Sequence, residues 1–429
     1  MIPQHTIRLF FRFRLFLPLL MCLPVFVSAS YADRSPLTGQ ADASRLYSQI
    51  GDRDAVILMD PSGRLVAAKH INRPIIPAST LKVLTALASL HYLGESHRFS
   101  TLLYQDDEHN LYIKGFGDPL LVSETINAIT AELAEKLASV NDIILDAGYF
   151  ADPISIPGIS DSLQPYDAPN GALCANFNTV NFKRLENGVY TSAEPQTPLI
   201  PFVMKRVRSS ECDQGRIMLS AKAHECILYT GHLFAFFLEK HGVRTGSRIR
   251  MGDCDPHKVR HVYTHVSEHD LMSVIEKMLH YSNNYIANQL LIAASAKAYG
   301  EPGSLDKGVA AIEAFCRETF GSNDISLSEG SGISRKNRVT ASYMAGVLKT
   351  FQPYHHLLRK EKNIFFKTGT LRGIRTRIGY IAGRTGGLYP FGIFFNTPGK
   401  TDEAVLKQLR EVVDRIDGPN RVADNQGGD

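Results

Sequence analysis

The sequence has little excess of charge of either sign. Its 429 residues carry a formal net charge of +4, and Arg8, Arg12 and Arg14 supply three of those charges within the first 32 residues. The rest of the chain therefore carries +1. This near-balance gives no electrostatic reason to expect a nucleic-acid partner. Long apolar runs are missing as well, since no stretch after residue 32 is apolar enough to span a bilayer.

Cysteine is also scarce. One of the six cysteines lies in the N-terminal segment, and the five that follow are Cys174, Cys212, Cys226, Cys254 and Cys316. Because five is an odd number, at least one thiol stays unpaired. A chain of this length can build its core without disulfides. The sequence leaves open whether one bridge forms, for example within residues 212–254, and which pair would form it.

The N-terminus is typical of a secretory signal. Residues 8–14 contain three arginines, residues 15–27 are largely apolar, and small residues follow up to Ala32. Pro18 and Pro24 interrupt the apolar run, which favours a cleaved signal over a membrane anchor. We therefore expect residues 1–32 to direct the protein to the periplasm. Cleavage of the signal and peripheral association with a membrane both stay open.

The remaining sequence has a globular composition, with 44% hydrophobic and 21% charged residues, and its length predicts two or three domains. Apolar patterns indicate a hairpin over residues 55–68 and a helix over residues 79–93. From residue 99 to 259, short strand patterns alternate with turn signals, which indicates an inserted, mainly β region. Helical and then strand patterns follow over 260–416, and the polar residues 417–429 have the composition of a disordered tail.

A serine and a lysine at the start of the 79–93 helix could form a nucleophile with its own base. Ser79 and Lys82 are three residues apart, so both project from one face of the helix. A neutral lysine can take the serine proton if burial and a neighbouring cation lower its pKa. The pattern is short, however, and Ser304 and Lys307 repeat it. Alone, it indicates only a helix cap and a surface lysine.

Two later motifs give the first one its significance. Ser282 and Asn284 lie two residues apart, and Lys367, Thr368 and Gly369 follow an apolar run as the end of a strand would. Lys367 would be the cation that lowers the pKa of the first lysine, and it would attract a substrate carboxylate. Thr368 offers a hydroxyl group, and the glycine allows a backbone to approach closely. The order of the three motifs predicts acyl transfer through a serine ester.

With these motifs the chain resembles the low-molecular-mass class C penicillin-binding proteins, the D-alanyl-D-alanine carboxypeptidase/endopeptidase family S13. The gap of 200 residues between Lys82 and Ser282 is a hallmark of that family, whereas related serine β-lactamases have much shorter gaps there. The resemblance covers most of the chain after the signal. It rests on residues 77–82, 115–119, 145–146, 282–284, 329–335 and 367–371.

The resemblance implies an α/β (α+β) fold of the β-lactamase/transpeptidase-like type. The catalytic domain would be an antiparallel sheet flanked by helices, built from two separate segments, residues 33–98 and 260–416. Residues 99–259 would form one or two inserted, mainly β domains.

The resemblance also implies a role for each reactive residue. Ser79 would be acylated by the penultimate D-alanine of a peptidoglycan peptide, with Lys82 as its base. Ser282 would relay the proton towards the leaving amine, held with Asn284 near the base. Lys367 would bind the terminal carboxylate of the substrate.

Further residues are assigned to substrate binding by the same resemblance. Thr368, Gly369 and the N–H group of Thr370 would contact the terminal carboxylate and the reacting carbonyl oxygen. Asp146 and Arg335 match the aspartate and the arginine with which related enzymes grip the side chain of a diaminopimelate residue.

Two positions depart from the family pattern. Arg372 stands where related carboxypeptidases have a glutamine, and Asn288 stands where the family often has a glutamate. The side-chain preference next to the scissile bond therefore stays open. The partners implied are muropeptides that end in D-alanine or are cross-linked through it, together with β-lactam antibiotics. Neither a metal nor an organic cofactor is implied.

Two alternatives share the fold. Tyr281-Ser282-Asn283 also spells the middle motif of class C β-lactamases, which would suit a β-lactamase or an esterase. The long gap before Ser282 argues against that class. A non-catalytic wall-binding protein is the other alternative, and the intact motifs argue against it.

A metal-binding protein is an alternative of a different class. Four histidines recur at every fourth position and would form one stripe on a helix. The alternating Val262, Thr264 and Val266 favour a strand instead, which would leave only two of the histidines on one face. The stripe consists of His257, His261, His265 and His269.

Overall fold

The structure, a computed structural model, describes residues 40–418 with gaps at Ser247 and Asn323. The predicted signal, residues 1–32, and residues 419–429 of the predicted tail lie outside the described residues. The described residues belong to one compact unit, Ser35–Asp429. Among them, no helix is both long enough and apolar enough to cross a membrane.

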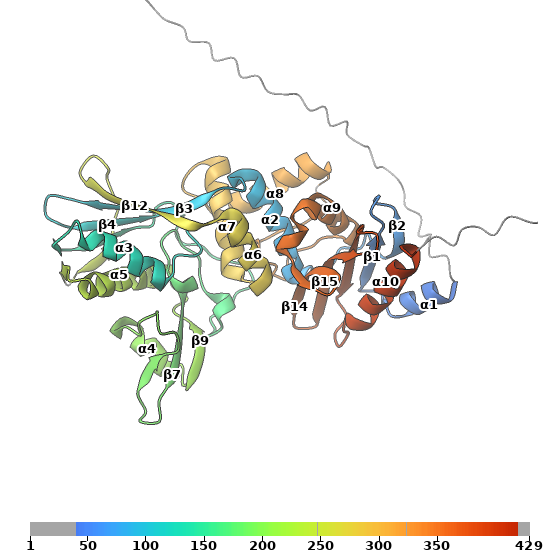
Figure 1. Cartoon of the computed structure of the whole chain (residues 1–429), viewed down its shortest axis with the longest axis horizontal. Coiled ribbons are helices and arrows are strands. Elements are labelled where there is room, and N and C mark those ends of the chain that lie inside the picture. The colour runs from blue at the N-terminus through green and yellow to red at the C-terminus, as the bar shows by residue number, and fades with distance from the viewer. Residues whose placement is uncertain (1–39, 247, 323, 419–429) are drawn as a thin grey trace, which may run out of the picture. The chain divides into compact units, whose positions relative to one another are not determined.

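A six-stranded antiparallel sheet combines residues from both ends of the described chain (Figure 1). Strand β1 pairs with β16 near the end of the chain, with Ala55 opposite Phe394. β1 also pairs with β2, so the predicted hairpin forms two strands of this sheet. In spatial order the strands are β13 (Arg359–Glu361), β14 (Ile364–Leu371), β15 (Ile374–Ala382), β16 (Leu388–Phe395), β1 (Ala55–Met59) and β2 (Leu65–Lys69).

Helices cover both faces of this sheet. Alternate residues of a strand point to opposite faces, and β1 is buried on both sides. Val56 and Leu58 pack into one apolar cluster, whereas Ala55 and Ile57 pack into the main core. This confirms the predicted α+β class, an antiparallel sheet flanked by helices. The first cluster includes α1 (Gln40–Ser48) and α10 (Glu403–Ile416), and the main core includes α2 (Lys82–Leu93) and α9 (Ala341–Phe351).

Three further helices pack against α2 (Figure 1). Each of them begins with a side-chain cap, supplied by Asp270, Asn283 and Ser304 respectively. The first of these helices ends where the second begins, at Ser282 and Asn283, so the second sequence motif lies at a corner beside α2. The helices are α6 (Leu271–Tyr281), α7 (Asn284–Tyr299) and α8 (Leu305–Phe320).

Residues 99–259 contribute strands and helices of their own. A five-stranded sheet has the order β11-β6-β4-β3-β12, and helices α3 and α5 pack against it (Figure 1). A three-stranded sheet has the order β8-β7-β9, and a two-stranded one pairs β10 with β5. The bounds are β3 (Arg98–Gln105), β4 (Leu111–Gly115), α3 (Ser123–Ala134), β5 (Ser139–Val140), β6 (Ile143–Asp146), β7 (Thr179–Arg184), β8 (Tyr190–Ser192), α4 (Pro201–Ser209), β9 (Gln214–Met218), α5 (Ala223–Lys240), β10 (Arg244–Thr245), β11 (Ile249–Met251) and β12 (Arg260–Asp270).

None of the five cysteines among the described residues forms a disulfide. Cys174 is buried, and burial raises the pKa of its thiol to about 11. Burial likewise raises the pKa of Cys316 to about 11. Thiols held protonated in this way are poor nucleophiles, so these two serve the core by packing.

The start of the predicted tail is attached to the sheet. The carboxylate of Asp417 accepts hydrogen bonds from the backbone and hydroxyl of Thr385, at 2.9 and 2.6 Å, and from the hydroxyl of Tyr389 at 3.0 Å. These bonds fix the chain just after α10.

Candidate active site

Ser79 lies in a 3₁₀ turn, η1 (Ala78–Leu81), that continues directly into α2. Ala78 adopts a left-handed conformation with φ of 49°. A non-glycine residue seldom adopts this conformation, and it costs on the order of 1 kcal/mol or more. Packing in the main core offsets that cost. The turn presents Ser79, which is only partly buried, at the start of the helix.

Lys82 is fully buried and its ammonium position has three neighbours. Its Nζ lies 2.8 Å from Asn284 Oδ1 and 2.7 Å from the carbonyl oxygen of Ser331, both of which can only accept. The third neighbour is Ser79 Oγ at 2.9 Å. In a neutral amine, two N–H groups can satisfy the two acceptors, and the lone pair then faces the serine hydroxyl.

The surroundings of Lys82 favour that neutral form. Burial lowers the pKa of its amine well below the ordinary value, and the nearby charge of Lys367 lowers it further. The carboxylate of Glu329 acts in the opposite direction and is the smaller effect. The site therefore provides a serine hydroxyl with a base that can accept its proton.

The second motif lies at the corner between α6 and α7. Ser282 ends α6 in a left-handed conformation, with φ of 53° and ψ of 37°. Asn283 caps α7 by accepting a hydrogen bond from the backbone of Ile286 at 3.0 Å. That cap leaves Asn284 free to reach Lys82, the contact described above. The strained turn thus positions two side chains on the same side of the corner.

The third motif lies on β14. Lys367 is 3% exposed, and its Nζ donates to Ser282 Oγ at 2.8 Å and to the carbonyl oxygen of Thr368 at 2.7 Å. Burial lowers the pKa of Lys367 to about 7. The structure therefore joins the five predicted reactive residues in two bonded groups, Ser79–Lys82–Asn284 and Lys367–Ser282.

Gly369 allows β14 to lie against the nucleophile. A Cβ at this position would come within 2.8 Å of the backbone nitrogen of Ser79 and 2.3 Å of Thr376 Oγ1. The side chain of Thr376 and the backbone of Ser79 therefore take the space that a larger residue would need. Gly332, with φ of 83°, has a similar role because a Cβ there would lie 1.9 Å from the carbonyl oxygen of Ala78.

Glu329 organises the loop that follows it, a role that no sequence pattern indicated beyond its place in a family motif. The residue is fully buried, and six hydrogen bonds reach its carboxylate. Since the loop's Ser331 carbonyl contacts Lys82, the carboxylate fixes one wall of the site. The donors are Ser331 N and Oγ, Gly332 N, Ser334 N, Asn337 Nδ2 and Asn288 Nδ2, at 2.6–3.3 Å.

Replacing Glu329 with glutamine is expected to destabilise the protein by about 3 kcal/mol, because the new amide N–H₂ would face donors instead of accepting from them. Chemical denaturation of Glu329→Gln would measure the loss. Glu361→Gln, at an exposed position of β13, is the matched control. Equal midpoints for the two variants would contradict the role assigned to the buried carboxylate.

The structure places Asp146 and Arg335 apart from the bonded groups. Asp146 is buried at the end of β6, where its carboxylate pairs with Lys114 at 3.3 Å and accepts from the backbone of Gly148 and Cys254. Arg335 is exposed and donates to the carbonyl oxygen of Arg372. Within the described residues, no hydrogen bond or ion pair joins these two residues to each other or to Ser79.

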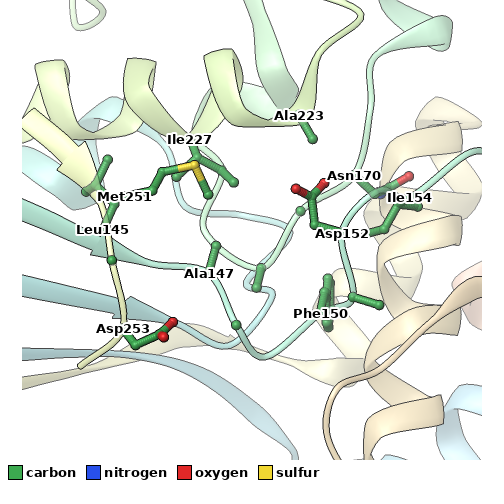
Figure 2. Close-up of a pocket in the computed structure, with 15 residues that line it drawn as sticks. Leu145, Ala147, Phe150, Asp152, Ile154, Asn170, Ala223, Ile227, Met251 and Asp253 are labelled. Atoms are coloured by element: carbon green, nitrogen blue, oxygen red, sulfur yellow. The ribbon is translucent and has the colours of Figure 1, made fainter. Parts of the chain in front are cut away.

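A cavity of about 330 Å³ adjoins the end of β6 (Figure 2). Figure 2 shows mostly apolar side chains around it, including Ile227 and Met251, with the carboxylates of Asp152 and Asp253 at its edges. None of the predicted reactive residues lines this cavity. A larger cavity of about 540 Å³ instead adjoins Ser282 and Asn284, lined by the aromatic residues Tyr166, Phe177, Tyr281 and Tyr285.

Two alternatives from the sequence can be compared with the structure. The second serine–lysine copy is a helix cap, since Ser304 accepts from the backbone of Lys307, whose side chain donates to backbone carbonyls. The histidine stripe lies at β12 and the loop before it, with His261 against Tyr104. Across residues 40–418, apart from the two gaps, no three metal-ligating side chains gather.

The transpeptidase-like sheet, with a serine and a buried lysine at the start of its neighbouring helix, is the arrangement of a serine-type peptidase. The family model for the D-Ala-D-Ala carboxypeptidase 3 (S13) family matches this chain over residues 49–226 and 209–360. The chain belongs to that family, as its motifs had indicated.

Two bacterial carboxypeptidases are similar to this chain. A D-alanyl-D-alanine carboxypeptidase of Actinomadura sp. is 24% identical over 377 residues, covering 73% of this chain and 70% of the relative. The DacB carboxypeptidase of Haemophilus influenzae is 23% identical over 408 residues, covering 78% of this chain and 84% of the relative.

The solved structures show the same fold. Penicillin binding protein 4 of Haemophilus influenzae superposes with a TM-score of 0.69 at 19% identity, covering 87% of this chain and 99% of that one. The same protein has been solved with a β-lactam bound. A predatory endopeptidase of Bdellovibrio bacteriovorus, in complex with an immunity protein, gives a TM-score of 0.51 at 17% identity, covering 85% of this chain and 92% of that one.

Proposed function

We propose that this protein hydrolyses peptides ending in, or cross-linked through, D-alanyl-D-alanine by way of an acyl-enzyme on Ser79. The observation that carries the proposal is the environment of Lys82, whose two accepting neighbours leave its lone pair facing Ser79 Oγ at 2.9 Å. A serine hydroxyl is a weak nucleophile until a base takes its proton. A buried amine with a lowered pKa is such a base at neutral pH.

The first half of the proposed reaction uses these contacts. Lys82 takes the proton of Ser79 as the oxygen attacks the carbonyl carbon of the penultimate D-alanine. The backbone N–H groups of Ser79 and Thr370 receive the negative charge that develops on the carbonyl oxygen. Lys367 and the hydroxyl of Thr368 hold the terminal carboxylate, which orients the scissile bond.

The leaving amine must receive a proton before the bond breaks. Ser282, bonded to Lys367, is the hydroxyl proposed to deliver it, and the proton that Lys82 took from Ser79 replaces the one that Ser282 gives, which makes Lys82 neutral again. Asn284 holds Lys82 in place. The C–N bond breaks, the amine departs and the acyl group stays on Ser79 as an ester. A water molecule then attacks the ester carbonyl, which restores the serine and releases the shortened peptide.

The substrate class comes from the family and from the chemistry of the site. Terminal trimming and cross-link cleavage present the same D-alanyl carbonyl to the serine, so both activities use one mechanism. A β-lactam carries a reactive carbonyl and a carboxylate in the same relation, and the Haemophilus relative binds one. We propose that penicillins acylate Ser79, and that the protein works on the cell wall in the periplasm.

Mass spectrometry of muropeptides tests the proposal directly. Purified protein lacking the signal is incubated with muropeptide monomers and dimers, and loss of terminal alanine or conversion of dimers to monomers is followed. Either product supports the proposal, and the ratio of the two measures the balance of activities. Unchanged monomers and dimers would overturn it, and rapid steady-state hydrolysis of penicillin would favour a β-lactamase.

The pH dependence of peptide hydrolysis should have two limbs. Lys367 is charged only below its pKa of about 7, so kcat/KM is expected to fall as the pH rises through about 7. Lys82 must be neutral, so kcat/KM also falls at acid pH as this residue gains a proton. In Lys367→Arg the cation persists at all pH values, and the alkaline fall should disappear. A fall at the same pH in that variant would contradict the assignment.

A further inference from the structure

The cavity of about 540 Å³ beside the corner between α6 and α7 includes Ser282 and Asn284 in its lining. Its other walls come largely from the inserted segment, namely the turn η2 (Pro165–Asp167), the start of β7 and the strand β9. Neither Ser79 nor Lys367 lines it, so the cavity adjoins the second motif and not the nucleophile itself. We call six of its lining residues the aromatic pocket: Tyr166, Phe177, Arg216, Lys277, Tyr281 and Tyr285.

Two tyrosine rings of the aromatic pocket are exposed and have no partner. Tyr281 is 80% exposed and Tyr166 is 53% exposed, and no large hydrophobic side chain among the described residues is more exposed than Tyr281. Neither side chain makes a hydrogen bond or a ring contact within that part of the chain. Phe177 and Tyr285, by contrast, meet edge to face with their ring centroids 6.1 Å apart. A ligand that covers the two exposed rings would remove apolar surface from water, which favours binding.

The aromatic pocket also carries a cation without an acidic partner. Lys277 lies one helical turn before Tyr281 on α6 and makes no hydrogen bond or ion pair with any described residue. Arg216, in contrast, pairs with Glu194 and donates to Thr179 Oγ1 at 2.8 Å. The pocket thus combines apolar rings with an unpaired positive charge, which suits a peptide that carries acidic groups.

The proposed chemistry places the leaving group beside this pocket. Ser282 delivers a proton to the leaving amine, so that amine lies next to a residue that lines the cavity. The turn that carries Tyr166 is held at the same place, because its backbone carbonyl accepts a hydrogen bond from Asn284 Nδ2 at 3.5 Å. A chain attached to the leaving amine therefore starts beside the aromatic pocket.

The two proposed activities differ in what the leaving amine carries. Trimming releases a single alanine, whose methyl group needs little space. Cleavage of a cross-link releases an amine that belongs to a second peptide. A cavity of about 540 Å³ is within the range that holds drug-sized ligands, so it has room for several groups of that peptide.

We infer that the aromatic pocket binds the second peptide of a cross-linked dimer, the peptide that departs with the leaving amine. This inference rests on the proposed function. It gives the inserted segment a part in the reaction, since η2 and β9 supply Tyr166 and Arg216. The enzyme should therefore cleave a cross-link faster when the second peptide is long enough to reach the pocket. None of the six residues of the aromatic pocket has a role assigned from the carboxypeptidase family pattern.

Two synthetic dimers test this selection. They share the first peptide and the scissile D-alanyl bond. The second peptide is complete, with free carboxylates, in one dimer and is cut back to the residue that supplies the amine in the other. The wild-type protein should prefer the complete dimer by about 10- to 100-fold in kcat/KM, mainly through KM. Lys277→Gln should reduce that preference by a smaller factor of about 3, as expected for one partly exposed charge.

Variants of the two exposed rings locate the effect. Tyr166→Ala and Tyr281→Ala together should reduce the preference to below about 3-fold. Hydrolysis of the shortened dimer should stay at the wild-type rate, which shows that folding and chemistry are intact. Tyr281→Phe keeps the ring and should keep the preference. Tyr299→Ala, at a 48% exposed position at the end of α7 and outside the cavity, is the matched control and should retain the full preference.

The outcomes separate the two proposals. Equal rates for the two dimers in the wild type, an undiminished preference in the double variant, or alanine release from monomers without hydrolysis of either dimer would overturn the peptide site alone. Hydrolysis of neither dimer, with no alanine release from monomers, would overturn the proposed function, and the peptide site with it. Competition by peptide-free glycan strands that requires the two tyrosines, without any preference between the dimers, would show a glycan site and would also overturn the peptide assignment.

Discussion

Ser79→Ala is expected to lose D-alanine release from muropeptides by at least about 10⁴-fold, because no other group can carry the acyl intermediate. Ser79 is the hydroxyl that the lone pair of the buried Lys82 faces, and the left-handed turn at Ala78 presents it. Removal of the Ser79 hydroxyl leaves a small cavity at a partly exposed position, so the fold should persist. The measurement is the initial rate of alanine release at saturating substrate.

The chain contains its own control for this substitution. Ser304→Ala removes the serine of the second serine–lysine copy, which caps α8. That change should cost about 1 kcal/mol of stability and leave the rate of alanine release unchanged. Residual activity of Ser79→Ala within about 10-fold of the wild type would show that the nucleophile is another residue.

Lys82→Arg should place a fixed positive charge where the wild-type amine is neutral, and should lose the base. An arginine stays protonated at every pH that the protein tolerates, so it cannot accept the proton of Ser79. Acylation by penicillin should slow by about 10² to 10⁴-fold, the range that a general base contributes. Stopped-flow measurement of acylation separates this step from the later hydrolysis of the ester.

The matched control for Lys82→Arg is a substitution of Lys307, the lysine of the second serine–lysine copy. Lys307 donates to the backbone carbonyls of Gly300 and Pro302, and Lys307→Arg should therefore acylate at the wild-type rate. If Lys82→Arg acylates as fast as Lys307→Arg, another group must be the base. Circular dichroism of both variants would check that a lost rate reflects chemistry and not unfolding.

The reactive residues could be predicted from the sequence because each belongs to a short local pattern. The spacing of Ser79 and Lys82 fixes their relation on any helix. Lys367 follows an apolar run that had to be a strand, and β14 includes it. The order of the three motifs along the chain then indicated that these distant residues belong to one site, which a local pattern alone does not show.

The residues that support the site could not be derived in this way. The bonds to Glu329 come in part from Asn288 and Asn337, and nothing in their spacing pairs them with a carboxylate. Asp146 fitted a family pattern, yet its observed partners are Lys114 and two backbone N–H groups.

The helices of the inserted segment show a different limit of prediction from the sequence. Short strand patterns and turn signals indicated strands between residues 99 and 259, and the structure contains strands there, among them β3, β4 and β6. The same criterion overlooked α5, although Cys226, Tyr229, Leu233 and Phe237 recur along it at helical spacing and are buried. That helical spacing was the signal in the sequence from which α5 could have been predicted.

The central claim, an acyl-enzyme on Ser79, is tested most directly by locating the adduct. The protein is incubated with benzylpenicillin, denatured in acid, digested and analysed by mass spectrometry. Because ring opening adds the whole molecule, the peptide that contains Ser79 should gain the full mass of benzylpenicillin, and Ser79→Ala should show no adduct. An adduct on another residue, or alanine release by a protein that penicillin never modifies, would contradict the account.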